Sequence, residues 1–187
     1  MSSRITSAAP PYPESVQKRL DALMPPGVPP LRLFTMLARD ERLFERFMAG
    51  GLLDKGNLSL RQREIVIDRV TARCGSEYEW GVHATLFAGK AGLDDAQMTS
   101  LVHGSADDPC WADKTDRTLI RVADALIDRA TIEEPLWLEL AAGFTEEGCL
   151  EVIMLAGFYR TVSCLTNATA LPLEPFAARF PAPGMSA

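Results

Sequence analysis

Two side chains near the middle of the chain have the types and the spacing that acid–base chemistry requires. Glu79 and His83 stand four positions apart, and residues at that spacing lie on one face of a helix, within hydrogen-bonding reach. A carboxylate beside an imidazole orients the ring and raises its basicity, which suits a general base near neutral pH. The same spacing also suits a surface ion pair that stabilises a helix by about 0.3–0.5 kcal/mol. The spacing alone leaves both interpretations open.

Three further side chains near this pair are candidates for the same site. Glu64 lies on the preceding helix at the edge of its apolar arc, although a glutamate near a helix start is commonly a solvated residue favoured by the helix dipole. Tyr78 and Trp80 flank Glu79, and they could form the floor of a small apolar pocket with the tyrosine hydroxyl as a donor. Packing in the core is the other interpretation of Trp80.

The elements that must position these residues are helices. Apolar residues follow the helical period from residue 31 to residue 171, without the sustained alternation and hairpin turns of strands. Ser59 and Gln62 have the spacing of a capping box, and Gly92 stands where the helix carrying His83 should end. The sequence therefore predicts an all-α fold. The expected helices span residues 14–24, 31–39, 40–53, 60–74, 77–91, 94–103, 114–130, 134–142 and 146–168.

Composition divides the chain into three parts. Residues 1–30 contain two proline clusters, which leave room for one short helix and predict an arm that packs on the domain or on a neighbouring subunit. Residues 31–175 form a single helical domain, and residues 176–187 form a loose tail. The helix around residues 148–170 is apolar over most of its circumference, so it must be buried in the core or at a subunit interface.

Composition and charge exclude several classes of function. The chain has 187 residues and a formal net charge of −6, so it lacks the clustered lysine and arginine that nucleic-acid binding needs. No continuous apolar run approaches the ~20 residues of a membrane span, and the N-terminus lacks the apolar region of a signal peptide. We therefore expect a cytoplasmic protein with no membrane partner. The four cysteines lack C-x-x-C spacing and the two histidines are too few for a zinc site, which predicts free thiols and no metal.

The string Cys-Gly-Ser-Glu-Tyr-Glu-Trp-Gly-Val-His that ends at His83, with the helix before it, resembles the carboxymuconolactone decarboxylase and alkylhydroperoxidase D-like (AhpD-like) superfamily. The resemblance is strongest over residues 58–101 and extends more weakly to the helix that contains Gly157-Phe-Tyr-Arg. It implies an AhpD-like helical bundle for residues 31–175. It also implies a homo-oligomer, a trimer or hexamer assembled around paired helices.

The resemblance assigns roles residue by residue. In the peroxidase-like branch a glutamate precedes a C-x-x-C pair and then a histidine, and these positions fall on Glu64, Ser76, Glu79 and His83. Both redox cysteines are thus replaced, and disulfide exchange needs a thiolate and a resolving partner. Cys74 lies two positions too early, so peroxidase activity of that type is not expected. The decarboxylase branch shows E-x-x-x-H at the head of this helix, which Glu79-Trp-Gly-Val-His83 fits.

The leading hypothesis is a cofactor-free lyase or isomerase acting on a small carboxylated or lactone-like substrate. His83 would move a proton at the carbon beside a carbonyl, Glu79 would orient and polarise His83, and Glu64 would be a second acid–base or positioning group. This hypothesis needs no cofactor. The predicted substrate-binding residues are Ser76, Tyr78 and Trp80.

Two other classes of function stay open. One is a thiol-dependent antioxidant protein that uses Cys74 with an unusual partner, although the other cysteines offer no partner by sequence. The other is a non-catalytic oligomeric scaffold or ligand-binding protein that kept the fold and lost the chemistry.

Overall fold

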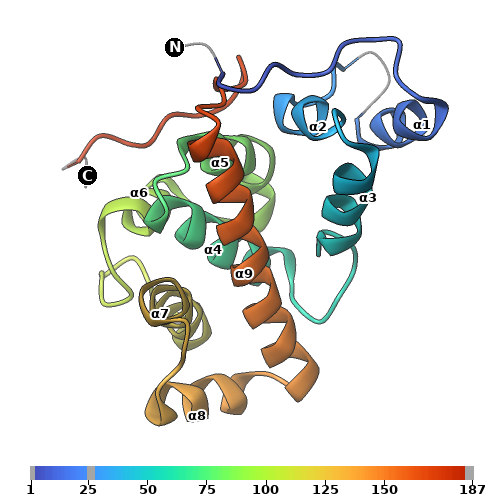
Figure 1. Ribbon diagram of the computed structural model, residues 1–187. Helices are drawn as coiled ribbons and strands as arrows, with labels where there is room; N and C mark the ends of the chain where they lie inside the picture. Colours follow the sequence, from blue (N-terminus) through green and yellow to red (C-terminus); the bar gives the residue numbers. More distant parts are fainter. Residues whose placement is uncertain (1–2, 25–27, 184–187) are drawn as a thin grey trace.

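The computed structural model describes residues 3–24 and 28–183, and within these residues it contains nine α-helices and no β-strand (Figure 1). Every expected helix is present, and no helix end differs by more than three residues from the expected one. The prediction of an all-α fold is therefore confirmed. The helices are α1 (Glu14–Leu23), α2 (Arg32–Leu37), α3 (Glu41–Gly50), α4 (Leu60–Arg73), α5 (Glu77–Ala91), α6 (Asp95–His103), α7 (Lys114–Arg129), α8 (Glu134–Gly143) and α9 (Glu146–Ala168).

Local signals in the sequence account for the ends of the helices that form the site. The Ser59 hydroxyl accepts from the backbone N–H of Gln62, whose side chain in turn accepts from the Ser59 N–H, so α4 begins with a complete capping box. Helix α5 ends at Gly92, which adopts φ = +66°, a left-handed conformation that glycine reaches without strain. Helix α3 is shorter than expected because Gly50 and Gly51 end it.

Helix α4 lies at the centre of the bundle and packs against α5, α6, α7 and α9 (Figure 1). The side chains from Glu64 to Thr71 are all buried, so this helix has no solvated face along most of its length. Arg69 offsets part of the buried charge, because its guanidinium pairs with both carboxylate oxygens of Asp124 on α7 at 2.7 and 2.9 Å. Residues on α4 are consequently held against α5 and α9.

The N-terminal helices stand to one side of this bundle (Figure 1). The single short helix expected in the proline-rich arm is α1. Its Val16 and Leu20 share a small apolar cluster with Ala38 and Phe44, which belong to the α2–α3 region. Contact with the bundle includes a ring pair between Phe47 and a residue of α9, Phe158, whose centroids lie 5.1 Å apart.

Helix α9 crosses α4 and also contacts α5, α7 and α8. By length and composition alone this 23-residue helix could span a membrane, with a mean hydropathy of 1.3 over its most apolar window. Its sequence contains no continuous apolar run of that length because polar residues interrupt the helix. Its contacts are those of a helix in a bundle core, and such core helices pass the same test of length and composition. Leu150 and Met154 nevertheless stay 61% and 59% exposed.

The chain after α9 returns along α5. The backbone N–H of Ala178 donates to the carbonyl of Gly81 at 3.2 Å, and the ring of Phe180 packs on Trp80 with centroids 5.2 Å apart. A Cβ on Gly81 would stand 2.2 Å from the Ala178 carbonyl oxygen, so this approach requires glycine. The described part of the tail, predicted as loose, therefore lies against the helix that carries His83.

Candidate active site

The predicted acid–base residues meet in the interior, where α4 packs against α5. The Nδ1 atom of His83 lies 2.7 Å from Oε2 of Glu64. An ionised carboxylate only accepts, so the ring N–H donates in this hydrogen bond. Glu64 is fully buried and His83 is 3% exposed. The alternative interpretation of Glu64 as a solvated residue is therefore wrong, because α4 is covered on every side at this position.

The second ring nitrogen of His83 faces two other groups. Its Nε2 atom lies 3.1 Å from the hydroxyl of Tyr159, on α9, and 3.5 Å from Oε1 of Glu79. The Tyr159 and His83 rings meet edge to face with centroids 5.1 Å apart, which fixes the tilt of the imidazole. Both carboxylates contact the ring: Glu79, expected to orient His83, lies near Nε2, and Glu64 makes the shorter contact at the opposite nitrogen.

The environment of His83 determines its charge. Burial by itself lowers the pKa of His83, but hydrogen bonds to Glu64 and Glu79, with the charges of both carboxylates, outweigh burial and raise the pKa to about 10. At neutral pH the ring is therefore an imidazolium with two N–H donors. The predicted general base is held in its acid form, ready to give a proton rather than to take one.

Arg63 connects the buried pair to the segment before α4. Its Nε lies 3.3 Å from Oε1 of Glu64, and its guanidinium donates to the carbonyl of Leu53 at 2.8 Å. The carboxylate of Glu64 thus touches two cationic groups, the Arg63 guanidinium and the His83 imidazolium. Removing one partner of such a buried pair leaves an uncompensated charge at a cost of about 3–5 kcal/mol.

Two acids in this region have oxygens without a donor. Asp68 follows Glu64 by one turn of α4 and is fully buried, and neither of its carboxylate oxygens has a hydrogen-bond partner. Oε2 of Glu79 is likewise buried and unpartnered. Burial raises the pKa of Asp68 well above its usual range; His83 lowers that pKa, while Glu64 and Glu79 raise it further. Buried polar atoms without partners are rare in folded proteins.

The three predicted substrate-binding residues make contacts within the protein, and the burial of Trp80 agrees with its interpretation as a core residue. The Ser76 hydroxyl pairs with the hydroxyl of Thr166 at 2.8 Å, in the interior between α5 and α9. The Tyr78 hydroxyl donates to a carboxylate oxygen of Glu174 and accepts from the backbone N–H of Leu33. Trp80 is buried against the C-terminal tail. These contacts do not bring the three side chains to the Nε2 atom of His83.

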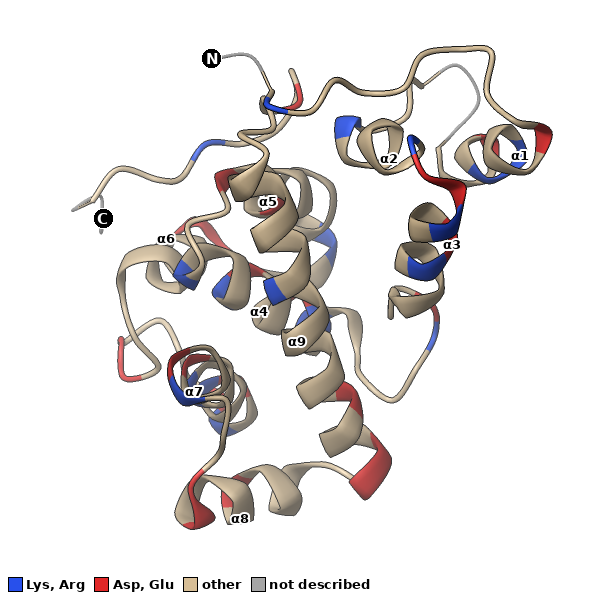
Figure 2. Ribbon diagram, in the orientation of Figure 1, with Lys and Arg blue, Asp and Glu red and all other residues tan. Residues whose placement is uncertain are grey.

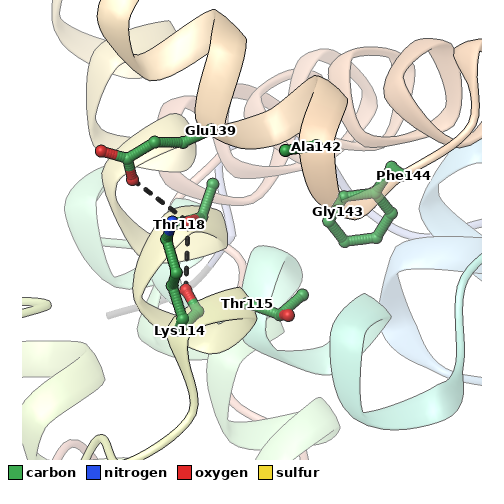
Figure 3. Close-up of a pocket in the computed structure, with 7 residues that line it drawn as sticks. All are labelled: Lys114, Thr115, Thr118, Glu139, Ala142, Gly143 and Phe144. Carbon is green, nitrogen blue, oxygen red and sulfur yellow. Dashed lines mark hydrogen bonds between the residues drawn. The ribbon is translucent and has the colours of Figure 1, made fainter.

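Cavities described on the surface lie away from His83. One cavity, of about 190 Å³, is formed by α7, α8 and the residue after α8, and a hydrogen bond from Thr118 to Glu139 crosses it (Figure 3). Another, of about 450 Å³, is lined by residues that include Tyr78 and Thr166, on the side of α5 that faces the chain end after α9. Among residues 3–24 and 28–183, no group of His, Cys, Asp or Glu side chains is arranged to hold a metal ion.

Three members of the buried cluster around His83 were not identified from the sequence. Asp68 interrupts the apolar run of α4 one turn after Glu64, and a carboxylate within such a run could have indicated an unusual buried acid. Arg63 precedes Glu64 in the sequence, but its hydrogen bond to the Leu53 carbonyl forms only in the folded chain. Tyr159 lies within the Gly157-Phe-Tyr-Arg string that carried the weaker part of the resemblance, and its distance of 76 positions from His83 hid the contact.

Comparisons with known proteins agree with this architecture. Residues 41–129 match the sequence model of the carboxymuconolactone decarboxylase family, which covers Glu64, Glu79 and His83. A search of curated proteins finds no match. The matched segment includes α3 to α7, and therefore the pairing of α4 with α5 on which the candidate site depends.

Solved structures extend the likeness to the fold of nearly the whole chain. An uncharacterised peroxidase-related protein from Silicibacter sp. TM1040 superposes with a TM-score of 0.81 at 19% identity, over 96% of both chains. A second uncharacterised peroxidase-related protein, described as an alkylhydroperoxidase AhpD core, comes from Ralstonia eutropha JMP134 and gives a TM-score of 0.79 at 17% identity, over 92% of this chain and 93% of that one. The chain thus has the AhpD-like fold, and its residues 41–129 are similar to the carboxymuconolactone decarboxylase family.

Proposed function

We propose that the protein is a cofactor-free lyase or isomerase that uses His83 for proton transfer on a small carboxylated or lactone-like substrate. The observation that carries this proposal is the buried imidazole ring, held at Nδ1 by Glu64 while Nε2 faces Tyr159 and Glu79. A structural ion pair on a helix surface would have no need of a second carboxylate from another helix, nor of burial.

The geometry supports a division of labour between the two ring nitrogens. Glu64 holds the ring, and the Nε2–H is the proton that can leave. Loss of carbon dioxide from a β-keto acid breaks a carbon–carbon bond and leaves its electron pair on an enolate, which needs a proton at carbon. Nε2 of His83 would give that proton, and the Glu79 carboxylate beside Nε2 would favour the return of a proton from water to the ring. A substrate reaches Nε2 only after neighbouring side chains move, because His83 is 3% exposed.

The chain provides a matched control for testing this proposal. His83→Gln should lower kcat about 10²–10⁴-fold on whichever β-keto acid or carboxylated lactone the protein turns over, measured as carbon dioxide release or loss of lactone absorbance. His103→Gln changes the other histidine of the chain, an exposed residue whose Nε2 bonds to the Pro181 carbonyl, and should leave kcat unchanged. Equal turnover by the two variants would overturn the proposal.

A thiol-dependent peroxidase is the second candidate, and one observation favours it. The Cys74 residue lies where α4 ends against α9, because Asn167 donates to the Cys74 carbonyl at 2.8 Å, and α9 also carries Cys164. The structure therefore brings Cys74 to a helix with a second cysteine, which the sequence did not indicate. Against this candidate, burial raises the pKa of the Cys74 thiol, which lowers its thiolate fraction at neutral pH.

Mass spectrometry separates the two candidates. Oxidation by hydrogen peroxide would convert the Cys74 thiol to a sulfenic acid with release of water, and attack by Cys164 would release a second water and form a disulfide. If the protein is a peroxidase, a disulfide that joins the Cys74 and Cys164 peptides should form at the rate at which peroxide is consumed. A Cys74 that stays reduced at stoichiometric peroxide, while His83→Gln abolishes turnover, leaves the acid–base proposal.

A further inference from the structure

Asp68 belongs to the buried cluster, and the function proposed above gives it no role. It lies on α4 one turn after Glu64, fully buried, with both carboxylate oxygens unpartnered. The other buried aspartate among the described residues, Asp116, has donors: it accepts from Arg61 at 2.8 and 3.0 Å. Asp68 alone among the described carboxylates combines full burial with two orphaned oxygens.

The groups that face Asp68 disfavour a negative charge on it. Glu64 from α4 and Glu79 from α5 both repel its carboxylate, and Tyr159 from α9 is a neutral neighbour of the cluster. Among the described residues, the cation that acts on Asp68 is His83, and its two ring nitrogens already face Glu64, Glu79 and Tyr159. An ionised Asp68 would therefore be a third buried carboxylate beside an imidazolium that already serves two, and the Arg63 guanidinium pairs with Glu64, so Asp68 would have no hydrogen-bond donor of its own.

A neutral Asp68 would supply a hydrogen-bond donor that the buried cluster around His83 lacks. A protonated carboxylic acid carries one O–H donor, and Oε2 of Glu79 is a buried acceptor without a donor. We propose that Asp68 is held as a neutral carboxylic acid whose O–H serves the unpartnered oxygen of Glu79. Glu79 can then remain ionised beside Nε2 of His83, and the ion pair keeps its proton. Asp68 is thus a positioning residue, and its effect on proton transfer rests on the proposed function.

Infrared spectroscopy tests the protonation state in the full-length protein without reference to turnover. In heavy water at pH 7, wild-type protein should show the carbonyl stretch of a protonated carboxylic acid, which shifts when aspartate carries ¹³C at the side-chain carboxyl. Asp68→Asn should remove this band, and Asp116→Asn, the matched buried control, should leave it in place. The labelled wild type decides the matter even if a variant fails to fold. Absence of the aspartic acid band, or its survival in Asp68→Asn, would overturn the proposal.

Nuclear magnetic resonance of His83 provides an independent measure. If Asp68 is neutral, Asp68→Asn removes no charge, and the pKa of His83 should move by less than about 0.5. If Asp68 is ionised, the same substitution removes an anion and should lower the pKa of His83 by about 1 or more. The latter result contradicts the proposal.

Two substitutions of Asp68 test whether it is the hydrogen-bond donor to Glu79. Asp68→Asn keeps an N–H donor for Glu79, whereas Asp68→Leu offers none. In Asp68→Leu we expect the infrared carboxylate band that moves with a ¹³C label on glutamate to shift, because Oε2 of Glu79 loses its donor, and in Asp68→Asn we expect no such shift. An unchanged glutamate carboxylate band in both variants would show that Asp68 is not the donor to Glu79. Failure of the proposed lyase activity would leave all three spectroscopic results unchanged.

Discussion

Single residues in the core of this protein carry charges that depend on one another. Glu64 touches both Arg63 and His83, and His83 in turn touches Glu79 and Tyr159. Because the ring is buried between carboxylates, His83 holds its proton more tightly in the folded protein than in the unfolded chain. The charge of the cluster therefore depends on folding, and its change with pH should change the free energy of unfolding.

The free energy of unfolding should fall as the pH rises from about 7 through 10. The pKa of His83 is raised to about 10 in the folded state, from an ordinary value of about 6.5 when unfolded. A group with a raised folded pKa contributes stability that is fully present below about pH 6.5 and is lost as the pH rises through the folded pKa. Urea unfolding of wild type and His83→Gln over this pH range checks it. A wild-type curve no steeper than that of the variant would count against the raised pKa.

Replacing Asp68 by asparagine should stabilise the protein at neutral pH. Holding an aspartate protonated at pH 7 costs up to about 4 kcal/mol relative to its free pKa, and asparagine has no such cost. The gain is smaller by whatever the amide loses in unpartnered groups. Asp116→Asn should instead destabilise, because it breaks the pairing with Arg61. Thermal unfolding at pH 7 compares them, and a large loss of stability in Asp68→Asn would contradict the expectation.

The residues of the candidate site were only partly predictable from the sequence. Glu79 and His83 stand at a helical spacing, so local geometry predicts their approach. Glu64 and His83 meet because α4 packs on α5, and periodicity alone does not say which side chains of two helices touch. Tyr159 joins from a third helix, which no local pattern indicates. The composition of the cluster is thus a tertiary property, while the carboxylate–imidazole pair is a local one.

At the scale of elements, helix ends follow local chemistry, and this is why they were predicted within a few residues. Capping by Ser59 and the left-handed Gly92 act within one turn, independent of tertiary contacts. The course of the tail could not be predicted in this way. It depends on the close approach of Ala178 to Gly81, which only the folded chain creates.

Two glycines of α5 give opposite predictions for the same substitution. Gly81→Ala should displace the tail, since a Cβ there would stand 2.2 Å from the Ala178 carbonyl oxygen. Gly89→Ala meets nothing within 4 Å and should stabilise α5 by about 0.5–1 kcal/mol. Thermal unfolding measures both, and limited proteolysis after Arg179 detects release of the tail. Equal melting temperatures and equal cleavage in the two variants would contradict the predicted role of Gly81.

On the scale of the whole molecule, one surface is more apolar than its surroundings. Trp137 and Leu138 on α8 and Leu150 and Met154 on α9 are exposed, and a cavity of about 470 Å³ lies among residues of these two helices. Acidic residues stand beside it in the first turn of α9 (Figure 2). Apolar surface of this kind commonly marks an interface. We propose that it is covered by another copy of the chain.

Light scattering after size-exclusion chromatography tests that assembly. Wild-type protein should be a trimer or hexamer at micromolar concentration, and the double substitution Leu150→Arg with Met154→Arg should reduce its mass toward that of a monomer. Leu43→Arg, at an exposed position of α3, is the control and should leave the mass unchanged. A monomeric wild type would refute the proposed assembly.

The tail that lies along α5 makes the helix of His83 observable by light. Trp80 is buried three positions before His83, with the ring of Phe180 against its indole. Indole emission shifts to longer wavelength when water reaches the ring. Departure of the tail would therefore shift the emission of Trp80, on the same helix as His83, to longer wavelength. With Trp111 and Trp137 replaced by phenylalanine, the protein would carry a single intrinsic reporter of how firmly α5 is covered while a ligand enters.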